Sequence, residues 1–296
     1  MLPLIIIAGP TTSKKSDTAI ELAEKLNAEI ISADSMQVYK YFDIGTAKVS
    51  PEGRARVPHH LIDILEPSEN FTAFDFKTLA LNLIRNLVKR NKIPIITGGT
   101  GLYLKVLCED YNCAVEINPE IKKQVQSETL SKGLSVLYKE LQGVDPTSAK
   151  KILPTDTQRI ERAVSVYRQT GITLSAFNET YSKSKYEFPI YTFLIKRDRE
   201  SLYTDINQRV DNMMKNGWVE EVRSIIDGGF SKRLKPFQSI GYSQIVDFLD
   251  KKQPLEQTID LIKRDTRHYA KRQITWFKKL YDSKTIDADY RDSPIT

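Results

Sequence analysis

Cysteine is almost absent from this sequence, which has only Cys108 and Cys113 among its 296 residues. A single C-x4-C pair forms neither a disulfide framework nor a zinc ribbon, so we expect two reduced thiols in a cytoplasmic protein. Long apolar runs are lacking as well. The most apolar amino-terminal stretch, Leu4 to Ala8, has no basic leader and is too short for a signal peptide or a membrane span. The sequence therefore predicts no membrane segment.

The chain has more basic than acidic residues: 44 lysines and arginines against 38 aspartates and glutamates, a net charge of +6. Such an excess favours a polyanionic partner but does not establish one. The hydrophobic share of 40% and the charged share of 28% are those of an ordinary globular protein. Because the chain is longer than most single domains, we expect one main domain with a smaller insertion.

Short apolar runs alternate with stretches of helical periodicity in the first hundred residues. The runs end just before Gly9, Asp34 and Gly98, and each is typical of a buried strand. Strands that alternate with helices form βαβ units, so we predict a parallel sheet with its site at the carboxyl ends of the strands. A further strand is predicted at Tyr191–Ile195.

The segment 114–186 is different, since it is polar and helical in pattern with no convincing strand. After it come two predicted helices, the second ended by Gly228-Gly229, and a long helix from about Pro254 to Tyr281. We therefore predict an α/β catalytic core formed by 1–113 and 187–296. The segment between them is predicted to be an all-helical insertion domain.

The first predicted strand leads into Gly9–Ser16, which nearly matches the phosphate loop G-x-x-x-x-G-K-[ST]. In such a loop, backbone N–H groups and a helix N-terminus face an anion. Lys15 adds a positive charge at the phosphates, and the Ser16 hydroxyl is a ligand for Mg²⁺. Lys14 stands where the pattern has glycine, and it either crowds the loop or adds a useful charge. The position between a strand and a helix favours a phosphate site over an ordinary glycine–proline turn.

Two polar residues follow the next predicted strands. Asp34 comes at the end of the second and suits a general base or a metal-shell ligand, although a lone aspartate there is more often a turn cap. Thr100 lies in the glycine-rich turn Gly98–Gly101 after the third strand, where it offers a hydroxyl beside an anion-friendly backbone. Taken alone, this turn is weak evidence.

Eight segments, in order along nearly the whole chain, resemble the bacterial type of the tRNA dimethylallyltransferase (isopentenyltransferase) family. They are Gly9–Ser16, Asp34–Tyr39, Asp43–Lys48, Pro58–Asp63, Gly98–Tyr103, Asp156–Ala163, Ile240–Tyr242 and Tyr269–Phe277. The resemblance implies a P-loop NTPase-like core with Mg²⁺ as cofactor. It also implies transfer of a dimethylallyl group from dimethylallyl pyrophosphate to N6 of the adenosine 3′-adjacent to the anticodon. The expected acceptors are tRNAs that read codons starting with U, and the expected by-product is pyrophosphate.

The resemblance also implies roles for single residues. Asp34 would take a proton from the adenine amine, Thr100 would position the amine and the leaving group, and Ser16 would hold the metal. The pyrophosphate cradle would comprise Arg209 with Gly9, Pro10, Thr11, Thr12, Ser13, Lys14, Lys15 and Ser16. Contacts with the tRNA anticodon stem-loop would come from Asp34, Ser35, Met36, Gln37, Thr100, Lys123, Gln158, Arg159, Ile160, Glu161 and Arg162.

The final predicted helix carries a basic side opposite an apolar one, and we interpret Lys271 and Arg272 there as further tRNA contacts. The adjacent histidines His59 and His60 are interpreted as structural. The two tryptophans, Trp218 and Trp276, are interpreted as core residues.

Three alternatives stay open at this point. A phosphate loop is typical of a small-molecule kinase, and prenyl transfer to free adenine nucleotides would need much the same site. The lysine in the loop also leaves room for an RNA-binding protein that has lost its activity. Nothing in the sequence demands more than a monomer.

Overall fold

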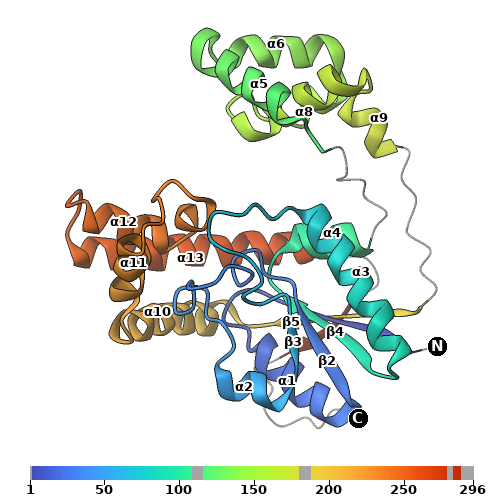
Figure 1. The fold of residues 1–296 in the computed structure, drawn as a ribbon, viewed down its shortest axis with the longest axis vertical. Helices are drawn as coiled ribbons and strands as arrows, with labels where there is room; N and C mark the ends of the chain where they lie inside the picture. Colours follow the sequence, from blue (N-terminus) through green and yellow to red (C-terminus); the bar gives the residue numbers. More distant parts are fainter. Residues whose placement is uncertain (1, 109–115, 180–187, 279–282, 288–296) are drawn as a thin grey trace. The chain divides into compact units, whose positions relative to one another are not determined.

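The computed structural model describes residues 2–108, 116–179, 188–278 and 283–287 (Figure 1). The chain divides into two compact units, one made of 1–104 with 186–296 and the other of 105–185. The predicted insertion at 114–186 overlaps the second unit, which begins earlier, inside helix α4 (Gly101–Cys108). Cys108 is half-buried at the end of α4, whereas Cys113 lies outside the described residues.

The larger unit is built on a six-stranded sheet in the order β3-β2-β4-β1-β5-β6, and every pairing is parallel. The strands are β1 (Leu4–Ala8), β2 (Ala28–Ser32), β3 (His59–His60), β4 (Ile93–Gly98), β5 (Ile190–Lys196) and β6 (Ser283–Asp287). The predicted parallel sheet is thus confirmed. Two strands were not predicted, β3 because it has only two residues and β6 because its sequence is polar.

Strand β1 lies between β4 and β5, and all five of its residues are buried. Branched apolar side chains of β1, β2 and β4 pack on helix α1 (Lys15–Leu26) through Ala19, Ile20 and Ala23. Helix α3 (Ala73–Lys89) begins at a capping box between Thr72 and Asp75. A short helix α2 (Pro51–Arg56) precedes β3. These layers fix the carboxyl ends of β1, β2 and β4 side by side.

A helical layer follows β5. It comprises α10 (Arg199–Lys215), α11 (Trp218–Asp227), the 3₁₀ turn η1 (Lys235–Gln238), α12 (Tyr242–Leu249) and α13 (Leu255–Phe277). Helix α11 ends at Gly228 as predicted. The predicted last helix is described as far as Phe277, and residues 279–282 lie outside the described part. Among the described residues, no helix is both long and apolar enough to cross a bilayer.

The two tryptophans have different environments. Trp218 is 2% exposed and packs against Gly45 and Gly241, which confirms it as a core residue. Trp276 is 37% exposed, so its prediction as a core residue is wrong. Its ring lies over Gly101, where an added Cβ would meet it at 2.1 Å, and it therefore covers the start of α4 from outside.

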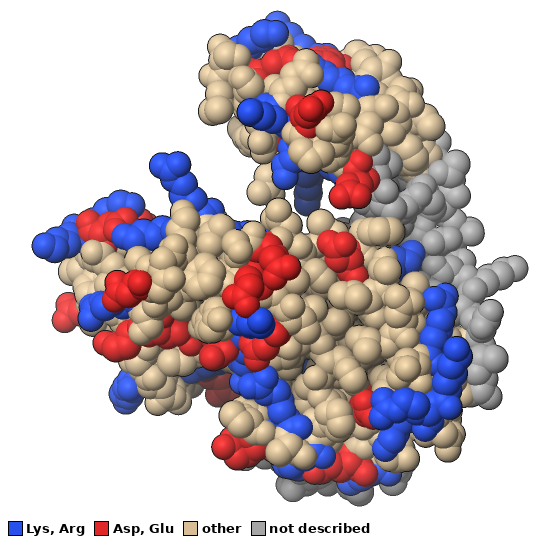
Figure 2. Space-filling view, viewed as in Figure 1, with Lys and Arg blue, Asp and Glu red and all other residues tan. Residues whose placement is uncertain are grey.

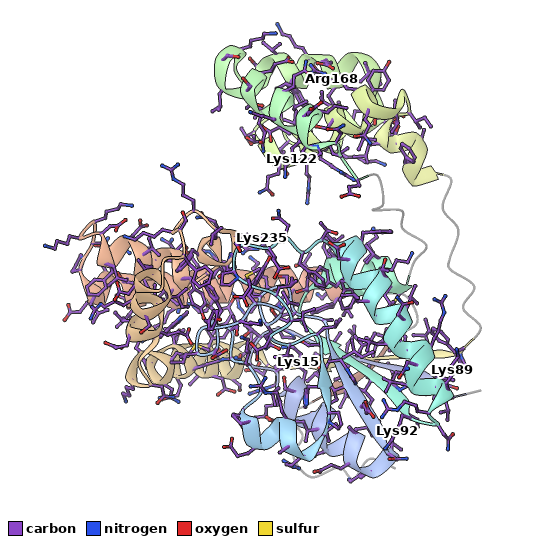
Figure 3. The ribbon with its side chains drawn as sticks, viewed as in Figure 1. Lys15, Lys89, Lys92, Lys122, Arg168 and Lys235 are labelled. Carbon is purple, nitrogen blue, oxygen red and sulfur yellow. The ribbon has the colours of Figure 1, made fainter. Side chains whose placement is uncertain are left out.

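In its described residues the smaller unit is all-helical, as predicted. Its helices are α5 (Pro119–Lys132), α6 (Leu134–Val144), α7 (Pro146–Ala149), α8 (Thr157–Thr170) and α9 (Leu174–Glu179). They enclose a core of their own that includes Val125, Leu137 and Ile160. Arg168 bridges Glu128 and Glu140 and so ties α8 to α5 and α6 (Figure 3). Lys and Arg side chains are interspersed with acidic ones on the visible face of this unit (Figure 2).

Candidate active site

The phosphate loop between β1 and α1 contains two non-glycine residues with left-handed backbone. They are Thr12, with φ 60°, and Lys14, with φ 62°. A side chain in this region costs about 1–2 kcal/mol, a cost that glycine avoids. Lys14 therefore keeps the backbone conformation that the missing glycine would supply. Its side chain is exposed, so the crowding considered from the sequence does not occur.

Residues from the other end of the chain hold this loop. The Thr11 N–H donates to Oε1 of Gln273 at 2.9 Å, and Gln273 Nε2 donates to the Gly99 carbonyl at 2.9 Å. Arg197 donates to the Thr12 carbonyl at 3.2 Å. Neither Gln273 nor Arg197 was predicted as a site residue. For Gln273 a signal was present, since it is a polar residue one helical turn after Tyr269 on the buried side of α13.

Two cations at the loop, Lys15 and Arg209, have no ion-pair partner among the described residues. Lys15 Nζ donates to the Pro10 carbonyl at 3.2 Å, and Arg209 from α10 donates to Thr11 Oγ1 at 3.5 Å. Among the described carboxylates, none forms an ion pair with either residue. Burial, helped by the Arg209 charge and opposed by Asp34, lowers the pKa of Lys15 to about 8. Burial also lowers the pKa of Arg209. Partly buried positive charge without an ion-pair partner favours the binding of an anion.

Asp34 and Thr100 lie at the adjoining strand ends. Asp34 Oδ1 accepts hydrogen bonds from the N–H groups of Met36 and Gln37, at 2.8 and 3.2 Å. Oδ1 thus caps the turn, as the turn-cap interpretation holds. Among the described hydrogen bonds, none involves Oδ2 of this carboxylate. Thr100 Oγ1 accepts from the Ser35 N–H at 3.1 Å, which joins the loops after β2 and β4.

Most of these residues line one small cavity of about 90 Å³. Thr100 does not line it, although it is bonded to Ser35, the residue next to the lining Asp34. His59, interpreted from the sequence as structural, also reaches this cavity, while its Nδ1 bonds the Val57 carbonyl. His60 does have a structural role, because it binds the buried carboxylate of Glu29 at 2.8 Å. The polar residues that line the cavity include Thr11, Lys15, Ser16, Asp34, Gln37, Arg209, Tyr269 and Gln273.

The cavity wall suits a hydrated Mg²⁺ that is held mainly by phosphate oxygens. Ser16 and Asp34 line it, and the buried Thr97 hydroxyl beside them has no hydrogen-bond partner in the described structure. Among the described residues, no group of three or more histidine, cysteine or acidic side chains is placed to hold a metal alone. The residues therefore fit a metal that arrives with its anion.

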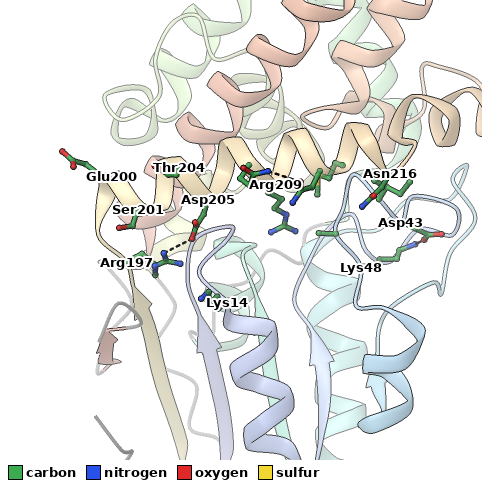
Figure 4. Close-up of a pocket in the computed structure, with 15 residues that line it drawn as sticks. Lys14, Asp43, Lys48, Arg197, Glu200, Ser201, Thr204, Asp205, Arg209 and Asn216 are labelled. Atoms are coloured by element: carbon green, nitrogen blue, oxygen red, sulfur yellow. Dashed lines mark hydrogen bonds and ion pairs between the residues drawn. The ribbon is translucent and has the colours of Figure 1, made fainter. Parts of the chain in front are cut away.

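A larger open groove, of about 1100 Å³, adjoins the cavity and shares Ala47 and Arg209 with it. Figure 4 shows Lys14, Lys48 and Arg197 facing this groove together with acidic residues of α10 such as Asp205. Arg197 and Asp205 form an ion pair at 2.8 Å. Arg209 is therefore accessible from both the groove and the cavity.

The residues predicted to contact tRNA are distributed over both units. In the helical unit, Lys123, Gln158 and Arg159 are exposed, and Glu161 accepts a hydrogen bond from Thr129 at 2.7 Å. Ile160 is fully buried in that unit's core, so its side chain holds α8 in place and does not face a partner. In the larger unit, Lys271 and Arg272 are both exposed on α13.

Comparison with known proteins defines the class to which this architecture belongs. The model of the IPP transferase family matches residues 37–280. The tRNA dimethylallyltransferase of Carboxydothermus hydrogenoformans is 46% identical over 96% of this chain and 92% of its own, and that of Alkaliphilus oremlandii is 43% identical over 93% and 88%. The chain therefore belongs to the IPP transferase family, whose curated members that it matches are tRNA dimethylallyltransferases.

Solved structures agree with this assignment. The tRNA isopentenylpyrophosphate transferase of Bacillus halodurans matches with a TM-score of 0.72 and 36% identity, over 97% of this chain and 90% of that one. A eukaryotic dimethylallyltransferase, captured acting on tRNA, matches with a TM-score of 0.84 and 31% identity, over 97% and 74%.

Proposed function

We propose that this protein is a transferase that moves the dimethylallyl group of dimethylallyl pyrophosphate onto tRNA. The acceptor is N6 of the adenosine 3′-adjacent to the anticodon, in tRNAs that read codons starting with U. One observation carries the proposal: the two unpaired cations Lys15 and Arg209 share a cavity with the carboxylate of Asp34. The reaction needs positive charge to stabilise the departing pyrophosphate and a base to accept the proton of the amine.

The cationic side of the cavity suits the departure of pyrophosphate. Breaking the allylic C–O bond builds negative charge on the phosphate oxygens, and Lys15, Arg209 and the loop N–H groups can stabilise it. These groups are in place before the reaction, since hydrogen bonds to Pro10 and Thr11 already orient them. A Mg²⁺ ion bound with the pyrophosphate at Ser16 would neutralise further charge.

The acidic side suits attack by the adenine amine, which is a weak nucleophile. Asp34 Oδ1 is fixed by two backbone N–H groups, and this orients the whole carboxylate at the edge of the cavity. The carboxylate takes the proton that N6 loses as the new C–N bond forms. Thr100, joined to the same loop through Ser35, positions the amine beside it.

The acceptor must turn its base out of the anticodon loop to reach a partly buried carboxylate. Flipping a base out of a single-stranded loop costs a few kcal/mol, which stacking and edge contacts recover. We propose that the exposed polar residues of α5 and α8, with Lys271 and Arg272 of α13, contact the anticodon stem-loop. We also propose that the enzyme acts in the cytoplasm, where its tRNA substrate is found, and that it acts as a monomer.

A kinase is less well supported than prenyl transfer. Phosphoryl transfer by a phosphate loop uses a carboxylate at the end of a neighbouring strand to hold Mg²⁺. Strand β4, the neighbour of β1, instead ends in Thr97 and Gly98. Prenyl transfer to free adenine nucleotides would use the same cavity but would give the helical unit no substrate to hold.

The test is to incubate the protein with labelled dimethylallyl pyrophosphate, Mg²⁺ and unmodified tRNA, in parallel with AMP. We expect label in the tRNA and none in AMP. A third reaction with ATP in place of the donor should give neither ADP nor a phosphorylated acceptor. Label in AMP alone would favour the free-nucleotide enzyme, and absence of label from both acceptors would contradict the proposal.

A further inference from the structure

Gln273 lies at a junction of three segments of the larger unit. Its amide accepts from the Thr11 N–H of the phosphate loop and donates to the carbonyl of Gly99, in the turn after β4. Both bonds are 2.9 Å long, and the residue is only 5% exposed. A Cβ on Gly99 would lie 2.3 Å from Nε2, so the amide fits against a backbone that only glycine provides. The chain places no other described side chain on the Thr11 N–H.

The phosphate loop that Gln273 contacts has a strained backbone. Thr12 and Lys14 are both left-handed without being glycine, and such backbone persists only where its surroundings fix it. Arg197 provides a second hold, because its guanidinium donates to the Thr12 carbonyl at 3.2 Å. The Arg197 side chain is 7% exposed and is itself fixed by Asp205.

We propose that Gln273 is a positioning residue for the pyrophosphate donor. It holds the phosphate loop in its anion-binding form before the donor arrives, and it thereby compensates for the lysine that replaces the loop glycine. The proposal rests on the function proposed above. It differs from a purely structural role in one respect: the need for Gln273 depends on the residue at position 14.

The consequence for affinity follows from populations. If the loop is competent in only a fraction of molecules, the apparent donor affinity falls by that fraction. Removing the Gln273 amide lowers this fraction, whereas glycine at position 14 raises it. Once the donor is bound, the loop is formed in either case, so turnover at saturating donor changes little.

The experiment is a double-mutant cycle of Gln273→Met and Lys14→Gly, with donor KM and kcat measured for prenyl transfer to tRNA. Gln273→Met alone should raise the donor KM by about tenfold, the scale of one lost buried hydrogen bond, and should change kcat by less than about threefold. Lys14→Gly alone should change KM by less than about threefold. Combined with Gln273→Met, it should restore most of the lost affinity. The loss of the Lys14 charge is common to both backgrounds and cancels in the cycle.

Gln169→Met is the matched control. Gln169 also accepts from a backbone N–H and donates to a backbone carbonyl, at Asn118 and Glu116, both at 2.8 Å, but it does so in the helical unit. Its replacement should leave the donor KM unchanged. Urea unfolding of each variant checks that it is folded in the assay. If Gln273→Met does not fold, Arg197→Gln removes the second hold and should show the same rescue by Lys14→Gly.

Two results would overturn the proposal. One is an unchanged donor KM in the folded Gln273→Met protein, and the other is an equal effect of Lys14→Gly in both backgrounds. If the wild-type protein transfers no prenyl group, the proposed function fails separately. The double-mutant cycle is then repeated with calorimetric binding of inorganic pyrophosphate and Mg²⁺. The same rescue by Lys14→Gly is expected, and its absence would refute the positioning role of Gln273.

Discussion

Replacing Lys15 with arginine should remove an alkaline limb from the pH profile of donor use. Burial lowers the pKa of Lys15 from 10.5 to about 8 in the free enzyme. The ammonium is then about 90% protonated at pH 7 but only about 10% at pH 9. Because the charged form binds pyrophosphate, kcat/KM for the donor should fall about fivefold from pH 8 to 9 and almost tenfold from pH 9 to 10. Arginine stays protonated over this range, so the Lys15→Arg profile should be flat, at a lower plateau because the guanidinium has a different shape.

The stability of the donor-free protein should change in the opposite direction. The folded pKa of Lys15 lies below its unfolded value, so the unfolded chain binds more protons between pH 8 and 10.5. The contribution of Lys15 to stability therefore rises with pH across this window. The two pKa values set an upper limit of about 3 kcal/mol, which partial exposure to water reduces. Subtracting the Lys15→Met curve from the wild-type curve in urea isolates this contribution.

The assay is the initial rate of prenyl transfer at subsaturating donor from pH 6.5 to 10, with tRNA in excess. Lys25→Arg, on the exposed end of α1, is the matched control and should keep the wild-type limb. A flat wild-type profile would refute the reasoning. So would a limb of the same midpoint in Lys15→Arg, because the titrating group would then lie elsewhere.

Three further predictions concern separate parts of the molecule. Ser16→Ala should raise the Mg²⁺ concentration for half-maximal rate by about tenfold, as a lost metal ligand would, and a Mg²⁺ titration that matches wild type would contradict the metal role. Gly241→Ala should destabilise the larger unit by about 2–4 kcal/mol in urea, because φ is 92° and the added Cβ would lie 2.0 Å from the ring of Trp218; a variant as stable as wild type would show that the ring can move. Arg159→Ala should weaken tRNA binding by a few-fold, reduce its salt dependence and leave the donor KM unchanged, whereas an unchanged salt slope would remove this exposed residue from the RNA contact.

The sequence was sufficient where the signal is local. The phosphate loop, the strand ends at Asp34 and Thr100, and the helical insertion all depend on residues close together in the chain. The hydrogen bond from the Thr11 N–H to Gln273 could not be predicted in this way, since the two residues are 262 positions apart. Only the fold brings α13 to the loops that follow β1 and β4. The left-handed backbone of Lys14 was equally out of reach, because nothing in the pattern says whether a lysine adopts a glycine's conformation or distorts the loop.

Short and mixed features limited the prediction elsewhere. Strand β3 has two residues, too few for a period to show, and its His59 reaches the cavity while its neighbour is structural. Ile160 stands within a motif of otherwise polar residues, and helical spacing turns it into the core of α8. Trp276 is apolar but covers a glycine from outside. In each case tertiary packing, which a single sequence does not display, decides the role of the side chain.

The central claim is that Asp34 and the cationic loop act together to prenylate one adenosine of tRNA. The most direct measurement is nuclease digestion and mass spectrometry of tRNA after reaction with dimethylallyl pyrophosphate. Wild-type protein should add one C5H8 to N6 of the adenosine 3′-adjacent to the anticodon. Asp34→Asn, which keeps the oxygen that binds Met36 and Gln37, should remain folded and lose about 10²–10⁴-fold in rate. Modification at another nucleoside, or full activity of the folded Asp34→Asn protein, would contradict the account.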